Sequence, residues 1–336
     1  MSIQPHRPGI PADILALSHE RDALRRQGNY ARADALKVQI EDAGYAIKDN
    51  PRGAHLVILP SIDLDGTTYR TARHVPSLLG EPTVPGSFSV IVLSHNTQEL
   101  TQRSIERVFQ FAGTHSVEVI LIDNASQDGL SIWADALRYN EPRLHVLRAS
   151  RIMGEAEARN LGLKRSKGEY ILFLDSSLEL EGDILTPLAE TLRSESVGIT
   201  GLRGLHTDDL RHFEESSERE VEVIDSLALA FKREVLKETG LLDERYRVSL
   251  YLDIDFNFAV RDAGLEVIVT SELPVTRQPV LRETILSDAE QARLNKRNFY
   301  RFLDKWGDRD DLLVGAEEED DDEDYEDDGI EDESEE

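Results

Sequence analysis

Apolar and polar residues alternate in blocks along the central part of the chain. Short apolar runs, such as "SVIVLSHN" from Ser89 and "VEVILIDN" from Val117, each end in polar residues. A segment whose apolar residues recur every three or four positions follows each run, which is typical of an amphipathic helix. Strands and helices that alternate in this way predict a mostly parallel sheet. Ligands bind such sheets at the edge where the strands end.

The sheet is expected between residues 88 and 306 of this 336-residue chain. Its first strands and helices are expected in turn at 88–96, 98–111, 117–128, 130–139, 144–150, 154–165 and 170–177. The last strand is the apolar run "YILFL", which ends at Asp175. Such a run is typical of a strand that is covered on both faces. The predicted fold class is α/β with a Rossmann-like, mostly parallel sheet.

Residues 1–62 show a different pattern, which predicts a small helical hairpin module. Apolar residues stand at helical spacing on both sides of Gly28-Asn29, a pair that breaks helices. Two short apolar runs then surround the turn at residues 50–53. The two helices and two strands are expected at 11–27, 30–43, 45–49 and 54–62.

Two segments are expected to lack regular structure. Residues 63–87 are rich in proline and glycine and would form a linker. Residues 307–336 would form a disordered acidic tail, because sixteen of the last twenty residues are Asp or Glu and cannot build a core. We interpret the tail as solubilising; the alternatives are a tether for a basic partner and a decoy for nucleic acid. The rest of the chain carries −12 of the formal net charge of −28, which disfavours broad nucleic-acid binding.

Composition excludes several classes of protein. The chain has no cysteine, so disulfides and thiolate metal sites are ruled out. No apolar run is long enough to cross a bilayer. The N-terminus lacks the basic and apolar regions of a signal peptide. We therefore expect a soluble cytoplasmic protein.

Polar residues end three of the expected strands. They are Ser94-His95-Asn96, Asp123-Asn124-Ala125-Ser126 and Asp175-Ser176-Ser177. A single Asp at such a point is often a helix cap or part of a turn. Three such endings on strands of one sheet instead indicate a common ligand cleft.

The region from Ser89 to Trp306 resembles the family 2 glycosyltransferases, which have the GT-A fold. The resemblance rests on the order and spacing of "SVIVLSHN", "EVILIDNASQDG", "GEAEARNLGLKRSKGEYILFLDSS", "LAFKREVLKETGLLDERY" and "YLDIDFNFAVRDAGLEVI". It is closest to the rhamnosyltransferase-like branch of bacterial surface polysaccharide enzymes. The resemblance implies hexosyl transfer from a nucleoside diphosphate sugar to a hydroxyl of a glycan or lipid-linked sugar, usually with inversion.

The resemblance also implies roles for single residues. Ser94 and Asn96 would line the nucleotide pocket, and Asp123 would accept a hydrogen bond from the imide N–H of uracil or thymine. Arg159 and Asn160 would lie beside the ribose or the diphosphate. The remaining nucleotide-sugar contacts would be Asp175, Ser177, Asp255 and Arg277.

The general base is expected in "YLDIDF". Asp253 matches the family's base, which takes the proton of the attacking hydroxyl, and Asp255 matches a later Asp of the motif. Leu252 stands where the family has Glu. The alternative is that Asp253 only caps the helix that begins there.

The metal site of the family is reduced in this chain. Ser177 replaces the second Asp of the Asp-x-Asp motif, and Arg277 stands near the position of the metal-binding His. Asp175 is then the one carboxylate left for Mg²⁺ or Mn²⁺, which prefer several oxygen ligands. We therefore expect that no metal is required and that arginines stabilise the diphosphate. One alternative is that the diphosphate itself brings Mg²⁺ or Mn²⁺ to the site. Another is a catalytically silent relative that binds nucleotide, RNA or a protein.

The segment "ERDALRRQGNYARADALKVQIEDAGYAIKDNPRGA" resembles the C-terminal anticodon-binding module of cysteinyl-tRNA synthetases. The resemblance covers about residues 18–54 and implies contact with tRNA or other structured RNA. The arginines expected at RNA phosphates are Arg21, Arg25, Arg26 and Arg32. The alternative is an ordinary helical hairpin with solvated arginines.

Overall fold

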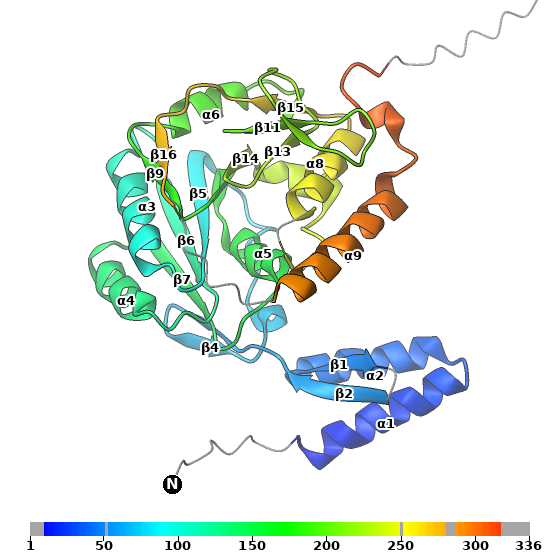
Figure 1. Ribbon diagram of the computed structural model, residues 1–336. Coiled ribbons are helices and arrows are strands. Elements are labelled where there is room, and N and C mark those ends of the chain that lie inside the picture. The colour runs from blue at the N-terminus through cyan, green and yellow to red at the C-terminus, as the bar shows by residue number, and fades with distance from the viewer. Residues whose placement is uncertain (1–9, 51–52, 249–250, 280–286, 317–336) are drawn as a thin grey trace, which may run out of the picture.

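The computed structural model describes residues 10–50, 53–248, 251–279 and 287–316. Within these residues, a nine-stranded sheet forms the centre of the molecule (Figure 1). In spatial order its strands are β15 (Glu266–Val269), β10 (Val197–Gly201), β14 (Ala228–Lys232), β8 (Gly168–Leu174), β5 (Val84–Ser94), β6 (Val117–Asp123), β7 (Leu144–Ala149), β3 (Ile62–Leu64) and β4 (Thr67–Tyr69). The predicted mostly parallel α/β sheet is confirmed.

Strand direction decides which segments share an edge of the sheet. β8, β5, β6 and β7 are parallel, and Ser94 lies level with Asp123 and Arg148 in the register. β14 runs antiparallel to both β8 and β10, so β10 points the same way as β8. The ends of β5, β6, β8 and β10 and the beginning of β14 therefore meet at one edge.

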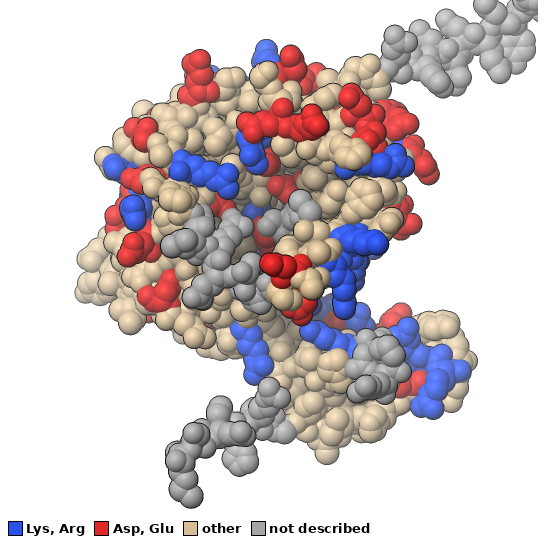
Figure 2. Space-filling view, viewed as in Figure 1, with Lys and Arg blue, Asp and Glu red and all other residues tan. Residues whose placement is uncertain are grey.

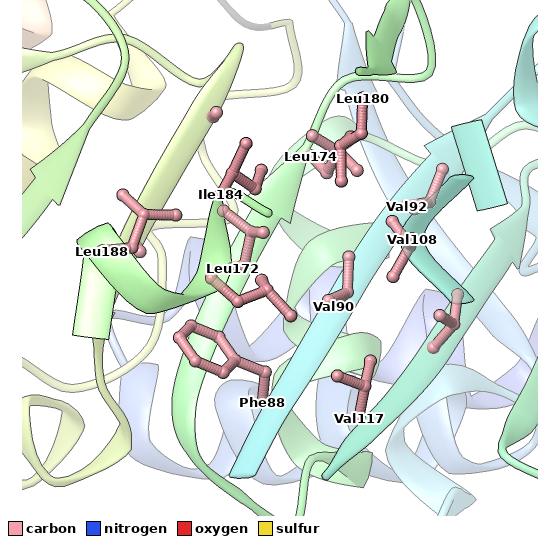
Figure 3. Close-up of a cluster of buried hydrophobic side chains, with 14 of the residues drawn as sticks. Phe88, Val90, Val92, Val108, Val117, Leu172, Leu174, Leu180, Ile184 and Leu188 are labelled. Carbon is pink, nitrogen blue, oxygen red and sulfur yellow. The ribbon is translucent and has the colours of Figure 1, made fainter. Parts of the chain in front are cut away.

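Two apolar layers cover the two faces of the sheet. Side chains alternate along β5, so that Val90 and Val92 enter one layer and Ile91 enters the other. The first layer, shown in Figure 3, packs under α3 (Gln98–Gln110), α4 (Leu130–Asn140) and α6 (Leu185–Thr191). The second packs under α5 (Glu155–Arg165) and α8 (Leu252–Asp262). Each aliphatic side chain buried in this way stabilises the fold by about 1.5–3 kcal/mol.

Helix α9 (Asp288–Trp306) adds a third apolar cluster against α8. It begins with a capping box between Ser287 and Glu290. Phe302 packs edge-on against Phe258 of α8, with ring centroids 5.2 Å apart. The chain continues to η3 (Asp310–Leu312), where Leu312 is buried in the same cluster. The prediction that the disordered tail begins at residue 307 is therefore wrong for residues 307–316, whereas residues 317–336 lie outside the described residues.

The N-terminal module has the predicted elements. Helices α1 (Ala12–Arg26) and α2 (Tyr30–Asp42) are followed by the hairpin of β1 (Tyr45–Asn50) and β2 (Gly53–Ile58). The Asn29 side chain caps α2 by accepting a hydrogen bond from the N–H of Arg32, after a left-handed Gly28. Leu24, Ala33 and Leu36 form a small core between the helices.

Residues 63–87 are not an irregular linker. β3 and β4 pair with each other, and β3 also pairs with β7, so this segment extends the main sheet by two strands. Val75 is buried in the second apolar layer, and β5 already begins at Val84. Proline and glycine composition indicated a linker here, but the short strands between the turns were missed. Among the described residues, no helix combines the length and the apolar composition that crossing a bilayer requires.

Candidate active site

The first two polar strand ends lie together, as the sequence predicted. The N–H of Asn124 donates to the carbonyl of Ser94 at 2.8 Å, and Nδ1 of His95 lies 2.7 Å from the carbonyl oxygen of Asn124. The backbone N–H of Asn96 donates to Oγ of Ser126. These bonds join the ends of β5 and β6 into one polar loop cluster.

Ser94 and Asn96 take different positions in this cluster. The Ser94 hydroxyl is buried and bonds to the Thr97 and Thr101 hydroxyls, so it holds the first turn of α3. Asn96 has a left-handed backbone and lines a cavity of about 440 Å³. The cavity is also lined by Thr97, Gln98, Glu99, Leu100, Arg103, Asp128, Gln278 and Pro279. Its volume lies in the range that suits small ligands.

Asp123 is buried at the end of β6 with an accepting oxygen to spare. Its Oδ1 accepts from the N–H of Ser126 at 2.8 Å in a tight turn. No other hydrogen bond to this carboxylate is found among the described residues, so Oδ2 can still accept from a ligand. This geometry is compatible with the expected contact to an imide N–H.

The motif Asp175-Ser176-Ser177 forms a closed turn at the end of β8. Oδ1 of Asp175 accepts from both the N–H and the hydroxyl of Ser177, at 2.8 and 2.5 Å. The N–H of Asp175 donates to the carbonyl of Leu227, the residue that precedes β14. Ser177 is buried. The motif is therefore tied both to itself and to the beginning of the neighbouring strand.

Arg277 does lie next to this motif. β16 (Val275–Arg277) pairs with β9 (Leu178–Leu180), which places Arg277 opposite Leu178. The N–H of Gln278 donates to the carbonyl of Ser177 at 2.8 Å. Arg277, the residue expected near the position of the family's metal-binding His, is thus exposed and lies beside the reduced motif.

The side chains present do not fit a resident divalent ion. Mg²⁺ prefers about six oxygen ligands and is usually held by one or two carboxylates together with waters and substrate phosphates. Asp175 is the carboxylate of the motif, and one of its oxygens already accepts two hydrogen bonds from Ser177. Nowhere in the described part of the chain do three His, Cys, Asp or Glu side chains gather as a metal site would require.

Asp253 lies at the beginning of α8, where Tyr251 has a left-handed backbone and makes no side-chain cap. Its Oδ2 accepts from the N–H of Ser226, 3.0 Å away on the segment before β14. Burial raises the pKa of Asp253 to about 6; the guanidinium of Arg159 opposes this shift and the carboxylate of Glu155 adds to it. The bond reaches out to another segment, so helix capping alone does not account for Asp253. A carboxylate with this pKa is ionised, yet still basic, near pH 7.

Arg159 and Asn160 are neighbours on α5 but point to different partners. Arg159 donates to Glu155 at 2.8 Å, lies over the ring of Phe173 and influences the pKa of Asp253, so it belongs to the site. The Asn160 side chain is buried and bonds to the backbone N–H and carbonyl of Leu242. Its amide therefore fixes a loop, and the expected ligand contact is not what its hydrogen bonds show.

Asp255 is also turned away from the cleft. Its Oδ1 accepts from Nζ of Lys305 and from Nε1 of Trp306, both at 2.9 Å. Its backbone position on α8 is two residues after Asp253, which places the two carboxylates on different sides of the helix. The expectation that Asp255 contacts the nucleotide sugar is replaced by a structural role: it anchors the end of α9.

The arginines of the N-terminal module are not equivalent. Arg21 is buried and forms an ion pair with Asp22, so it does not fit the expected surface contact with a phosphate. Arg25, Arg26 and Arg32 are exposed. Arg32 forms an ion pair with Glu20. Basic side chains gather on the visible face of the module in Figure 2. RNA binding by the exposed arginines stays a prediction.

Sequence reasoning missed Arg203, Asp225 and Ser226, which complete the edge of the sheet. Arg203 follows the end of β10, and Asp225 and Ser226 come just before β14. The signal was present in "VIDSLALAF", where polar residues directly precede an apolar run. It was missed because β14 is antiparallel to its neighbours. Its first residues therefore lie at the edge where β5, β6, β8 and β10 end.

The model of the family named Glycosyl transferase family 2 matches residues 89–261, about half of the chain. "Glycosyltransferase GlyG" of Streptococcus pneumoniae is 27% identical over 33% of this chain and 36% of its own length. "Putative teichuronic acid biosynthesis glycosyltransferase TuaG" of Bacillus subtilis is 31% identical over 32% of this chain and 42% of its own. The match with these curated relatives thus spans well under half of their length.

A solved structure described as "Crystal structure of GalNAc-T7 with UDP, GalNAc and Mn2+" shares the fold. It superposes with a TM-score of 0.57 at 16% identity and covers 67% of this chain and 49% of its own. The fold, the strand-end cluster and the family match agree with one another. This chain belongs to glycosyl transferase family 2.

Proposed function

We propose that the protein transfers a sugar from a nucleoside diphosphate sugar to an acceptor hydroxyl, with inversion at the anomeric carbon. The observation that carries the proposal is Asp253. It is a carboxylate with a pKa of about 6, held by the Ser226 N–H at the edge of the sheet where Asp123 and Asp175 also lie. The family match supports the transfer of a sugar from a nucleotide donor.

The reaction needs one base and one stabilised leaving group. Asp253 accepts the proton of the acceptor hydroxyl while that oxygen attacks the anomeric carbon. The bond between the anomeric carbon and the phosphate oxygen breaks, and its electron pair stays on the diphosphate. Attack from the face opposite the leaving group inverts the configuration at carbon.

The nucleoside would bind at the ends of β5 and β6. Asn96 lines the cavity there, and the free oxygen of Asp123 would accept from the imide N–H of uracil or thymine. Asp123, Asp175 and Asp253 are not among the residues that line the cavity, and Asp123 is linked to it through the bond between Asn96 and Ser126. We therefore place the base and ribose near the cavity and the sugar toward Asp253.

The leaving diphosphate would be stabilised by arginine. The negative charge that develops on it must be met by donors already in place. Arg277, beside the Asp175-Ser176-Ser177 turn, offers a planar fork of N–H groups that matches phosphate oxygens. Arg159 adds a second guanidinium near Asp253. Asp175 would orient the ribose.

A second candidate is a silent relative that binds a nucleotide without transferring a sugar. The observation in its favour is the closed turn in which Ser177 occupies an oxygen of Asp175. Leu252, which is buried where the family has Glu, also favours the silent relative. Fold alone does not decide between the two.

Binding and turnover together test the proposal. Uridine, thymidine and guanosine diphosphate sugars would be screened by thermal shift, because a ligand of the folded state raises the melting temperature. Donors that bind would then be assayed for transfer to polysaccharide fragments and lipid-linked sugars. Transfer from a uridine or thymidine donor supports the enzyme. Binding without transfer to any of these acceptors favours the silent relative, and a protein that binds no donor contradicts both.

A further inference from the structure

A second arginine, Arg203, lies at the same edge of the sheet as Asp175. β10 ends at Gly201 and points the same way as β8, so the residues that follow it emerge at the same edge of the sheet as the end of β8. β14, which lies between these strands, begins at this edge with Asp225 just before it. The topology alone therefore brings Arg203 and Asp225 next to the reduced Asp175-Ser176-Ser177 motif.

Asp225 holds the guanidinium of Arg203 in a fixed orientation. Nε of Arg203 donates to Oδ2 of Asp225 at 2.5 Å, and Nη2 forms an ion pair with the same oxygen. Asp225 is buried, and its Oδ1 accepts from the N–H of Leu227. The Arg203 side chain is 37% exposed, and its Nη1 forms a longer ion pair, at 3.7 Å, with the carboxylate of Glu215. Nε and Nη2 are therefore anchored to Asp225, while Nη1 is held by the longer contact with Glu215 on a partly exposed side chain.

A second arginine, Arg277, influences Asp225 electrostatically. Burial raises the pKa of Asp225, while the charges of Arg203 and, from β16, Arg277 lower it. Arg277 is therefore close enough to interact with Asp225 electrostatically. The ion pair of Asp225 is with Arg203, so the charge of Arg277 adds to the positive charge at the edge of the sheet beside Asp175.

The segment Asp225-Ser226-Leu227 joins these groups to the proposed base. Asp225 binds Arg203, the N–H of Ser226 donates to Asp253, and the carbonyl of Leu227 accepts from the N–H of Asp175. Three consecutive residues thus hold a cation, the base and the reduced metal motif in one arrangement. A salt bridge that only stabilised the fold would not need this position.

We propose that Arg203 binds the diphosphate of the donor together with Arg277, and that Asp225 is the positioning residue that orients the guanidinium of Arg203. This inference rests on the proposed function, because it assigns a further residue to the same donor site. The ligand chemistry is that of a nucleoside diphosphate: phosphate oxygens accept paired N–H donors from arginine. Arg203 would recognise the diphosphate and not the base or ribose.

The test compares a ligand that has the diphosphate with one that lacks it. Affinities of uridine diphosphate and of uridine would be measured by calorimetry for the full chain and for Arg203→Gln, Arg203→Lys and Asp225→Asn. The matched control is Arg309→Gln, since Arg309 is also 37% exposed and paired with carboxylates, but beside Asp262 on the other end of α8. Melting temperatures report whether each variant is folded.

We expect Arg203→Gln to weaken uridine diphosphate binding about 10-fold or more, since a charge-assisted hydrogen bond is lost, while uridine affinity stays unchanged. Arg203→Lys should recover part of the loss, because it keeps the charge but not the fork. Asp225→Asn should also weaken the diphosphate selectively, whereas Arg309→Gln should change neither affinity.

Two results would overturn the inference, and they are distinguishable. In the first, the unaltered protein binds uridine diphosphate, but Arg203→Gln binds it equally well or loses affinity for uridine diphosphate and uridine in equal proportion. Arg203 then has only a structural role, and the proposed function stands. If the unaltered protein binds no nucleoside diphosphate, the proposed function fails and this inference fails with it.

Discussion

The backbone N–H of Ser226 donates a hydrogen bond to Oδ2 of Asp253 at 3.0 Å, and so joins the segment before β14 to the first turn of α8. A hydrogen bond to the carboxylate favours its ionised form, whereas burial favours the protonated form. Burial is the larger effect, and the pKa of Asp253 rises to about 6. The proposed base is therefore held in place by a bond that keeps it ionised at pH 7.

This pKa predicts a pH-dependent gain in stability for Asp253→Asn. The pKa is higher in the folded protein than the unfolded value of 3.8, so ionisation costs folding free energy above pH 6 and nothing below pH 4. The variant cannot ionise and escapes this cost. We expect it to melt at a higher temperature than the unaltered protein at pH 8, with a difference that shrinks as the pH falls toward 4. Calorimetry at several pH values measures it, and a pH-independent difference would contradict the raised pKa.

Asp255 should matter for folding and not for ligand binding. Replacing it in Asp255→Ala leaves the Trp306 N–H and the Lys305 ammonium without their acceptor. An unsatisfied buried donor costs about 1–3 kcal/mol, so urea unfolding should show a loss of that size. The control Asp304→Ala, at an exposed position of α9, should stay within about 0.5 kcal/mol. If the variant folds normally but binds the nucleotide more weakly, Asp255 contributes to donor binding after all.

Asp123 should select the base of the donor. Its free oxygen can accept from the imide N–H of uracil or thymine, and Asp123→Ala removes that acceptor. We expect the variant to bind uridine diphosphate about 10-fold more weakly, since the imide donor is left unpaired. Titration calorimetry with uridine and guanosine diphosphates measures the preference. Equal affinity of the unaltered protein for the two would remove Asp123 from base recognition.

Removing metal ions distinguishes a diphosphate stabilised by Arg277 from one stabilised by a bound metal. Because the side chains around Asp175 do not fit a resident ion, transfer should survive EDTA. Arg277→Ala should lower kcat by about 10²-fold, since a donor to the developing charge is lost. Arg143→Ala, an arginine paired with Glu141 before β7, serves as the control and should change little. Activity that is abolished by EDTA and restored by Mn²⁺ would contradict stabilisation of the diphosphate by arginine alone.

The parallel core of the sheet could be predicted from the sequence because its strands are continuous apolar runs that end in polar residues. The register then confirms that Ser94 and Asp123 lie level at one edge. β3 and β4 could not be predicted, because three-residue strands between turns have no periodicity long enough to detect. Their pairing with β7 depends on contacts distant in sequence.

The candidate site could be predicted only in part, because it also depends on contacts between residues distant in sequence. Asp253 and Asp255 are two residues apart, and the rotation of α8 decides which one faces the cleft. That rotation follows from the packing of Phe256 and Phe258 into two different apolar clusters, which the sequence alone does not reveal. The approach of Arg277 to the Asp175 turn likewise depends on the pairing of β16 with β9.

The role of Asp253 as the base is tested by the effect of Asp253→Asn on transfer and on donor binding, measured in the same preparation. The substitution keeps the size of the side chain and the acceptor for the Ser226 N–H, but removes the base. We predict that kcat falls by about 10²- to 10⁴-fold while affinity for the donor stays within about twofold. The control Asp262→Asn, at the other end of α8, should retain full activity. Transfer at the unaltered rate by Asp253→Asn would contradict the central claim that Asp253 is the base.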